Sequence, residues 1–285
     1  MCIRDRPTGE ISDGRQPEAL LADTLAALGD GLLLVVTGAG ISRASGIPTF
    51  RGSDPDAVWK VSDVSMATFD YFRRDPVGQW QWYLARFDAV GDAQPNAAHR
   101  ALVDLQRWFE SRGGRCRIIT QNIDTLHERA GTEDLIKVHG TADRVRCSRP
   151  GCRLGAPEGS IDLAQVDFAP FRLAPSREHL PRCPACDAFL RAHVLFFDEY
   201  YLEHHDYRFG EAERLADEAD AILFIGTSFS VGITDLCLRA GGRRGAPMLA
   251  LDPALTAPPR PGLEVLSATA EELLPAVCQR LAQAS

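Results

Sequence analysis

Short apolar runs alternate with helical stripes along most of this chain. Leu32–Thr37 is a continuous run of apolar and β-branched residues, the pattern of a strand buried on both faces. Similar runs of strand length follow at Cys116–Thr120, Leu135–Val138, Ala221–Ile225, Pro247–Leu251 and Leu263–Leu266. Apolar residues at helical spacing mark Pro17–Leu28, Asn96–Phe109, Glu211–Ala219 and Thr269–Leu281. Strands that alternate with helices predict the α/β class, with a Rossmann-like, doubly wound parallel sheet covered by helices on both faces.

Two segments interrupt this alternation. The stretch Ser53–Val90 is helical and rich in aromatic residues, which favours a helical insertion. The stretch from Thr141 to Ala192 is rich in proline, glycine and cysteine and is interpreted as a small inserted module. We expect a disordered tail at 1–15, the Rossmann-like domain at 16–52, 91–140 and 193–285, the helical insertion at 53–90, and the small module at 141–192.

Four of the eight cysteines form two close pairs in the small module. Cys147 and Cys152 are separated by four residues, and Cys183 and Cys186 by two. Such pairs on turn-rich segments can bring four thiolates to the corners of a tetrahedron, so the sequence predicts one structural Zn²⁺ with no coordination position left for water. Two disulfides or four unrelated thiols are the alternatives. Three further cysteines lie in apolar stretches and are expected in the core: Cys116, Cys237 and Cys278.

Composition and charge narrow the possible partners. Hydrophobic residues make up 45% of the 285 residues and charged residues 25%, which is ordinary for a globular protein. With 31 Lys and Arg against 39 Asp and Glu, the formal net charge is −8, so direct binding to nucleic acid is not expected. No apolar run approaches the ~20 residues that span a bilayer, and no secretory signal is recognisable. We therefore expect a cytoplasmic protein without a membrane partner, and a monomer as the default state.

The first strand-like run leads directly into a glycine-containing loop, Gly38-Ala39-Gly40-Ile41-Ser42. Glycines at the end of a strand let the backbone approach a pyrophosphate, and the amides that follow can donate to its oxygens. The third glycine of the usual dinucleotide fingerprint is missing, because Arg43 stands at its position. No acidic residue ends a recognisable second strand either, so an ordinary dehydrogenase is disfavoured.

The longer string GAGISRASGIPTFRG at residues 38–52 resembles the nucleotide loop of the sirtuins, the NAD-dependent protein lysine deacylases. Further blocks resemble that family in the same order: Thr120-Gln121-Asn122-Ile123-Asp124, His139-Gly140, the paired cysteines, and Gly226-Thr227-Ser228. The resemblance covers about residues 20–283, and five blocks in order are far more specific than any one of them.

The resemblance implies NAD as co-substrate and a set of residues that bind it. Sirtuins break the bond between nicotinamide and ribose, and the acyl-lysine carbonyl oxygen attacks the ribose carbon. The implied contacts are Gly38, Ala39, Gly40, Ser42 and Arg51 for the pyrophosphate, Phe50 for the ribose face, Gln121, Asn122, Ile123 and Asp124 for nicotinamide and its ribose, and Gly226, Thr227, Ser228, Asp252 and Thr269 for the adenosine side. Asp252 replaces the usual asparagine, and a carboxylate can still accept hydrogen bonds from ribose hydroxyls.

By the same resemblance, His139 is the general base. An imidazole with a pKa near neutrality can take a proton from a ribose hydroxyl, whose oxygen then attacks the imidate carbon. Among the seven histidines, His139 alone precedes glycine in the family's pattern. His127 is expected to be structural, whereas His204 and His205 lack partners at ligand spacing and are expected on the surface.

The segment 191–199 resembles the part of sirtuins that pairs with the acyl-lysine substrate as an added strand. Within it, Val194, Phe196 and Phe197 are the expected substrate contacts. The usual glycine is replaced by Asp198. Since aspartate tolerates a positive φ better than most residues, we expect the turn to be kept.

One short motif bears on the acyl group. Tyr83 and Arg86 are three positions apart on a predicted helix, so both side chains can point into one pocket. The pair resembles the Tyr-x-x-Arg of class III bacterial sirtuins, which remove succinyl and malonyl groups. An arginine at the end of an acyl tunnel would bind a distal carboxylate through two hydrogen bonds. A packing tyrosine beside a solvated arginine is the alternative.

The leading hypothesis is therefore an NAD-dependent protein lysine deacylase with a structural zinc, which acts on acyl-lysine proteins or peptides and prefers succinyl or malonyl groups to acetyl. An NAD hydrolase or ADP-ribosyltransferase that uses the same site is the second hypothesis, motivated by the altered residue Asp198. The third is a non-catalytic NAD sensor with a zinc module, against which the complete set of Phe50, Asn122, Asp124 and His139 argues, because binding alone needs no general base.

Overall fold

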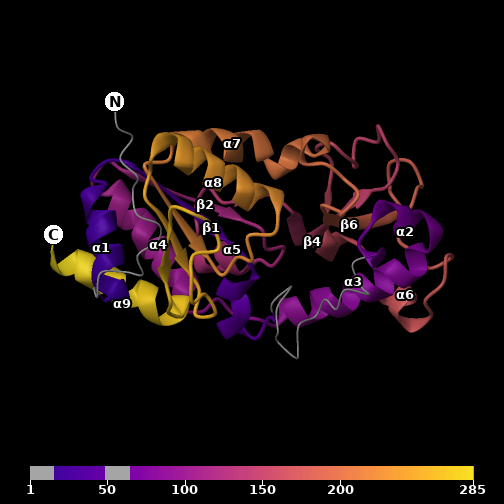
Figure 1. Ribbon diagram of the computed structural model, residues 1–285. Coiled ribbons are helices and arrows are strands. Elements are labelled where there is room, and N and C mark those ends of the chain that lie inside the picture. Colours follow the sequence, from indigo (N-terminus) through magenta and orange to yellow (C-terminus); the bar gives the residue numbers. More distant parts are fainter. Residues whose placement is uncertain (1–15, 49–64, 285) are drawn as a thin grey trace.

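The larger half of the molecule is built on a parallel sheet (Figure 1). The computed structural model describes residues 16–48 and 65–284. Six strands pair in the order β3-β2-β1-β7-β8-β9, and every neighbouring pair is parallel. Their bounds are Leu32–Thr37 (β1), Arg115–Thr120 (β2), Ile136–Lys137 (β3), Ala221–Ile225 (β7), Met248–Leu251 (β8) and Leu263–Leu266 (β9). The predicted fold class is confirmed.

Helices cover both faces of this sheet because both faces of its strands are apolar. On β1, Leu33 and Val35 pack into one core cluster, whereas Leu32, Leu34 and Val36 pack into another on the opposite face. The first cluster is covered by α1 (Pro17–Ala27), α4 (Ala97–Glu110) and α9 (Ala270–Gln283), and the second by α7 (Phe209–Glu218) and α8 (Gly232–Arg244) (Figure 1). A further short helix, α5 (Leu126–Ala130), follows β2.

The sequence pattern did not predict α8. Its composition is polar and contains two consecutive glycines, which weaken a helix by about 1 kcal/mol each relative to alanine. The structure explains Gly241, because a Cβ there would lie 2.7 Å from Met248 Sδ and 3.1 Å from Ile222 Cδ1. A small residue therefore lets α8 approach β7 and β8 closely.

The smaller half holds a second, antiparallel sheet, with the strand order β5-β4-β6 (Figure 1). Its strands are β4 (Gly140–Cys147), β5 (Ile161–Asp162) and β6 (Leu190–Val194), and the helices beside it are α2 (Phe69–Arg74), α3 (Pro76–Gly91) and α6 (Ala169–Leu173). A third core cluster joins α3 and α6 to this sheet, and the buried Trp80 donates from Nε1 to the Leu190 carbonyl at 2.8 Å. The prediction of helix within Ser53–Val90 holds for the described part; 53–64 and the tail at 1–15 lie outside the described residues.

Short 3₁₀ segments complete the description: Ala39–Ser45, Leu163–Gln165, Tyr201–Glu203 and His205–Tyr207. Among the described helices, none combines the length and the apolar character needed to cross a membrane.

Candidate active site

The residues expected to bind NAD, together with the expected general base His139, follow the carboxyl ends of all six parallel strands. The loop from Gly38 follows β1, Gln121–Asp124 follow β2, His139 follows β3, Gly226–Ser228 follow β7, Asp252 follows β8, and Thr269 follows β9. Because the strands are parallel, all these segments lie at one edge of the sheet. The strand order reverses between β1 and β7, the switch point at which open α/β sheets form their ligand crevice.

Two glycine turns meet at this switch point. The amide of Gly40 donates to the Gly226 carbonyl at 2.9 Å, and Gly226 has a φ of +57°. A Cβ on Gly40 would lie 2.5 Å from Gly226 Cα, and one on Gly38 would lie 2.7 Å from the Gly226 oxygen. No side chain can be accommodated at Gly38, Gly40 or Gly226, so at these positions the backbone itself is available to a pyrophosphate.

Beside these turns, three buried polar side chains form one cluster. Ser42 donates to Asp124 Oδ2 at 2.9 Å, and Asn122 Nδ2 lies 3.2 Å from Ser42 Oγ and 3.1 Å from the Gly38 carbonyl. Asp124 Oδ1 accepts from the Leu126 amide at 3.0 Å, which fixes the carboxylate by its own loop. The structure thus brings the serine of the first loop onto the asparagine and aspartate of the second. Phe50 and Arg51 lie outside the described residues.

His139 lies at the β3 end of this edge. Its Nδ1 is 2.8 Å from the Gln121 carbonyl, and Gln121 in turn donates from Nε2 to Thr227 Oγ1 at 3.1 Å. Burial lowers the pKa of His139 to about 4, although the bond to Gln121 acts in the opposite direction. The imidazole is therefore neutral at physiological pH, the form in which it can accept a proton.

A tyrosine that sequence reasoning missed also contacts this histidine. Tyr201 Oη lies 3.0 Å from His139 Nε2, and the two rings are stacked with centroids 5.9 Å apart. The pairing spans 62 residues, so no local pattern marks it. The only sequence signal was the position of Tyr201 two residues after the end of the predicted substrate segment.

On the adenosine side, the expected polar residues make local contacts. Ser228 is exposed and its Oγ lies 2.7 Å from Ser230 Oγ. Asp252 Oδ1 accepts from the Ala254 amide at 2.8 Å, and Thr269 donates to Glu272 Oε2 at 2.8 Å. These contacts hold the side chains at the ends of β8 and β9.

The predicted substrate segment lies along the smaller sheet and close to His139. The Leu195 amide donates to the His139 carbonyl at 3.0 Å, and the Phe197 amide donates to the Ala67 carbonyl at 3.0 Å. Val194 and Phe196 are buried, whereas Phe197 is 46% exposed. Only Phe197 of these three therefore presents much side-chain surface to a partner.

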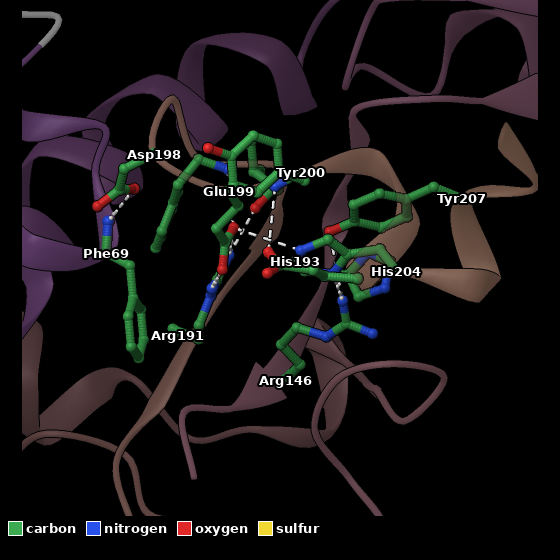
Figure 2. A network of polar contacts seen from close by, with 12 residues as sticks. Phe69, Arg146, Arg191, His193, Asp198, Glu199, Tyr200, His204 and Tyr207 are labelled. Atoms are coloured by element: carbon green, nitrogen blue, oxygen red, sulfur yellow. Dashed lines mark hydrogen bonds and ion pairs between the residues drawn. The ribbon is translucent and has the colours of Figure 1, made fainter. Parts of the chain in front are cut away.

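The expectation for Asp198 was wrong in its physical reason. The described non-glycine residues with a positive φ do not include it. Its carboxylate instead accepts hydrogen bonds from the amides of Phe69, at 2.7 Å, and Asp70, at 3.0 Å (Figure 2). Asp198 thus ties the substrate segment to the start of α2, a role that glycine could not fill.

Buried charged side chains hold the predicted substrate segment in place (Figure 2). Arg191 binds the Glu199 carboxylate with both terminal nitrogens, and Glu199 Oε2 also accepts from the Phe196 amide at 2.9 Å. Burial alone would raise the pKa of Glu199, but His204 and Arg191 hold it well below the ordinary value. The ionised Glu199 therefore fixes the turn at residues 196–199.

The prediction that His204 is a surface residue was wrong. It is 1% exposed, and its Nδ1 accepts a hydrogen bond from Arg146 Nη1 at 2.6 Å (Figure 2). Arg146 also binds Asp206 Oδ2 at 2.9 Å, and His193 Nε2 lies 2.6 Å from the same oxygen. These partners come from distant segments, which is why a search for ligand spacing missed them. His205 is exposed, as predicted, and His127 is buried.

Tyr83 and Arg86 both lie on α3, but their environments differ. Tyr83 is 2% exposed and packs on Phe87 and Phe196, and its hydroxyl has no hydrogen-bond partner among the described residues. Burial raises the pKa of Tyr83 above the ordinary value, and the positive charges of Arg191 and, to a smaller extent, Arg86 act in the opposite direction. The Arg86 guanidinium lies 3.7 Å from the centroid of the Trp82 ring and donates to the Trp82 carbonyl at 2.9 Å.

The two cysteine pairs converge as predicted. The sulfurs of Cys147, Cys152, Cys183 and Cys186 all lie within 4.8 Å of one another, and these thiols form no disulfide. Two of the separations are 3.4 and 3.7 Å, close to the roughly 3.8 Å expected between thiolates bound to zinc at ~2.3 Å in a tetrahedron. The cluster fits a structural Zn²⁺. Cys116 and Cys237 are buried, and Cys278 packs partly buried against the core, as expected.

The fold and this edge define a dinucleotide-binding α/β protein with a four-cysteine module. The profile of the Sir2 family matches residues 38–232. The chain is 40% identical over 223 residues to an NAD-dependent protein deacylase of Thermus thermophilus, covering 78% of this chain and 79% of that one. This chain belongs to the Sir2 family, so the resemblance noted in the sequence is confirmed.

Solved structures agree with this assignment. A Sir2 homologue in complex with NAD superposes with a TM-score of 0.76 at 31% identity, covering 97% of this chain and 98% of that chain. A structure described as Sir2 with a p53 peptide and NAD superposes with a TM-score of 0.72 at 26% identity, covering 93% and 98%.

Proposed function

We propose that this protein is an NAD-dependent protein lysine deacylase, which transfers the acyl group of acyl-lysine to ADP-ribose and releases nicotinamide. One observation carries the proposal: a neutral histidine and a buried Ser42–Asn122–Asp124 cluster lie at the same edge of a parallel sheet, beside two glycine turns. The names of the relatives and the NAD and peptide complexes of the structural neighbours support it.

The site suggests a division of labour along the sheet edge. Asp124, with Asn122 and Gln121, would hold nicotinamide and its ribose, and the glycine turns with Ser42 would hold the pyrophosphate. Thr227, Ser228, Asp252 and Thr269 would face the adenosine side. His139 would accept a proton from a ribose hydroxyl, which general-base catalysis favours because its ring is neutral.

A panel of acetyl-, succinyl- and malonyl-lysine peptides, each incubated with NAD, tests the proposal. We expect nicotinamide release and deacylated peptide from the native protein, and a loss of deacylation of about 10²–10⁴-fold in His139→Ala. Mass spectrometry of the reaction mixtures measures the deacylated peptide and the released nicotinamide for the native protein and the variant. Formation of deacylated peptide no greater than in the variant would refute the proposal, and free ADP-ribose formed without any acyl peptide would instead indicate NAD hydrolysis.

We further propose that the acyl pocket favours acyl groups with a distal carboxylate, such as succinyl or malonyl. The buried Tyr83 hydroxyl, without a partner among the described residues, and the half-buried Arg86 lie one helical turn apart on α3. A distal carboxylate would accept one hydrogen bond from the Tyr83 phenol and two from the Arg86 guanidinium.

Replacing Arg86 with methionine should lower kcat/KM for succinyl-lysine by about 10²-fold while changing that for acetyl-lysine less than threefold, because only the former loses a charge-assisted contact of roughly 2–3 kcal/mol. Steady-state kinetics on both peptides measure the split. Arg107→Met, which removes an exposed charge on α4, is the matched control and should leave both values unchanged. Equal losses on the two peptides in Arg86→Met would exclude carboxylate recognition by this residue.

A further inference from the structure

The contact between Tyr201 and His139 is not explained by the binding roles above. Tyr201 begins the 3₁₀ segment that follows the substrate strand and its turn. Its hydroxyl reaches the one nitrogen of His139 that is not bonded to the backbone, at 3.0 Å.

The hydrogen-bond pattern determines which atom donates. A carbonyl oxygen can only accept, so His139 Nδ1 must carry a proton in order to bond to Gln121. In the neutral ring, Nε2 then has a lone pair and no proton. The phenol of Tyr201 is therefore the donor to Nε2. The lone pair of Nε2, which would act as the base, already accepts a hydrogen bond from the tyrosine hydroxyl.

The tyrosine ring is held in this position from other sides. It stacks on Phe209 with centroids 4.1 Å apart and an interplanar angle of 13°. A Cβ on Gly232 would lie 3.6 Å from Tyr201 Cε2, so the ring also rests against the start of α8. Burial raises the pKa of Tyr201 to about 12, which keeps its hydroxyl protonated. A ring packed in this way does not leave Nε2 without moving its own 3₁₀ segment away from α7 and α8.

We propose that the Tyr201 hydroxyl carries the proton from the substrate ribose hydroxyl to His139, so that Tyr201 is a second catalytic residue of this protein. The inference rests on the proposed deacylase function. In this step the ribose O–H bond breaks and its proton binds Tyr201 Oη, while the Tyr201 O–H bond breaks and its proton binds His139 Nε2. Tyrosine ends neutral, histidine ends as imidazolium, and the ribose oxygen keeps the electron pair with which it attacks the acyl carbon.

Tyr201→Phe separates the step that needs a base from the step that does not. Cleavage of the nicotinamide bond precedes proton removal, so exchange of labelled nicotinamide into NAD should stay within about threefold of the native rate. Deacylation should fall by about 10²-fold or more, chiefly in kcat, as for the loss of a proton-transfer group. The neighbouring Tyr200, which is 74% exposed, provides the matched control, and Tyr200→Phe should change neither rate.

The other outcomes overturn the inference. An unchanged deacylation rate would show that the proton does not pass through the phenol. A faster rate would show that the phenol merely competes with the ribose for Nε2. Parallel losses of exchange and deacylation would assign Tyr201 a structural role only.

A second readout needs neither NAD nor activity. A donor to Nε2 stabilises the neutral imidazole, so Tyr201→Phe should raise the pKa of His139 above its native value, followed by NMR of protein with ¹⁵N-labelled histidine. Tyr200→Phe should leave it unchanged. If the His139 titration is the same in Tyr201→Phe, the hydrogen bond is not formed and the inference fails. If the bond is detected but the native protein deacylates no peptide, the proposed function fails instead.

Discussion

Replacing Cys183 with serine is expected to remove zinc from the protein and to unfold much of its smaller half. Two separate segments, 147–152 and 183–186, bring four sulfurs within 4.8 Å of one another, where one Zn²⁺ would bind all of them. Structural zinc contributes roughly 10–16 kcal/mol in isolated zinc-finger peptides, whereas a whole domain is stable by about 5–15 kcal/mol. Without zinc, only the backbone hydrogen bonds between β4 and β6 and the third core cluster would hold this part of the smaller half together.

The loss of zinc should also disrupt the active site. Residues 191–194 belong to β6 and residues 195–199 follow it directly, and the Leu195 amide is bonded to the His139 carbonyl. We therefore expect Cys183→Ser to lose both zinc and deacylase activity, and to melt about 10 °C or more below the native protein. Metal analysis and thermal unfolding followed by circular dichroism measure these changes.

Cys278→Ser is the matched control for this substitution. Its sulfur donates to the Ala101 carbonyl at 3.4 Å, a bond that a hydroxyl can also make, and it lies outside the cysteine cluster. The control should keep one zinc per chain and a nearly native melting temperature. A Cys183→Ser protein with a full zinc content and unchanged melting would contradict the structural role of the cluster.

The parts of the fold that could be predicted are those in which local pattern and burial agree. Leu32–Thr37 is apolar on both faces because both faces are covered, and its continuous run could be recognised without any tertiary information. The cysteine spacing was equally informative, since a metal site built on two turns requires two pairs of closely spaced cysteines, and such pairs can be recognised in the sequence. The order of the motifs indicated the sheet edge, because the carboxyl ends of parallel strands always meet there.

What could not be predicted depends on pairs of residues far apart in the chain. His204 looked like a surface residue because its partner, Arg146, lies 58 positions earlier. Asp198 looked like a substitute for a flexible glycine, whereas it caps the start of α2 about 130 residues earlier. Helix α8 was missed because its glycines lower the helix propensity. Gly241 is required by close packing against Met248, and helix propensity takes no account of such tertiary packing.

Acid is expected to destabilise this protein well before its carboxylates are protonated, because two buried histidines pack against each other beneath the site. His99 and His127 contact edge to face with centroids 4.9 Å apart, and they are 0% and 1% exposed. Burial lowers the pKa of His99 to about 4, against the opposing effect of Asp124, and burial, His99 and Lys137 lower that of His127 as well. Burial therefore disfavours the charged form of both rings in the folded protein.

The sign of this pH dependence follows from the number of protons that the folded and unfolded states bind. In the unfolded chain these imidazoles bind protons near pH 6.5, whereas in the folded protein His99 remains neutral down to about pH 4. Between these values the unfolded state binds more protons, so the free energy of unfolding falls as the pH falls from 6.5 towards 4. For His99 alone this amounts to roughly 3 kcal/mol over the whole window, and the stability contribution is fully present above pH 6.5.

Urea unfolding at pH 7.0, 6.0 and 5.0 measures this dependence, and His99→Phe isolates the contribution of one ring. Phenylalanine keeps an aromatic contact with His127 but binds no proton, so the slope of unfolding free energy against pH should fall by up to about 1.4 kcal/mol per pH unit. The exposed His205 supplies the control, since His205→Phe should retain the native slope. Acid also protonates the zinc-binding thiolates, but it does so in all three proteins, so the difference between slopes reports on His99 together with its effect on the pKa of His127. Equal slopes in His99→Phe and the native protein would mean that the pKa of this histidine is the same in the folded and unfolded states, against the effect of its burial.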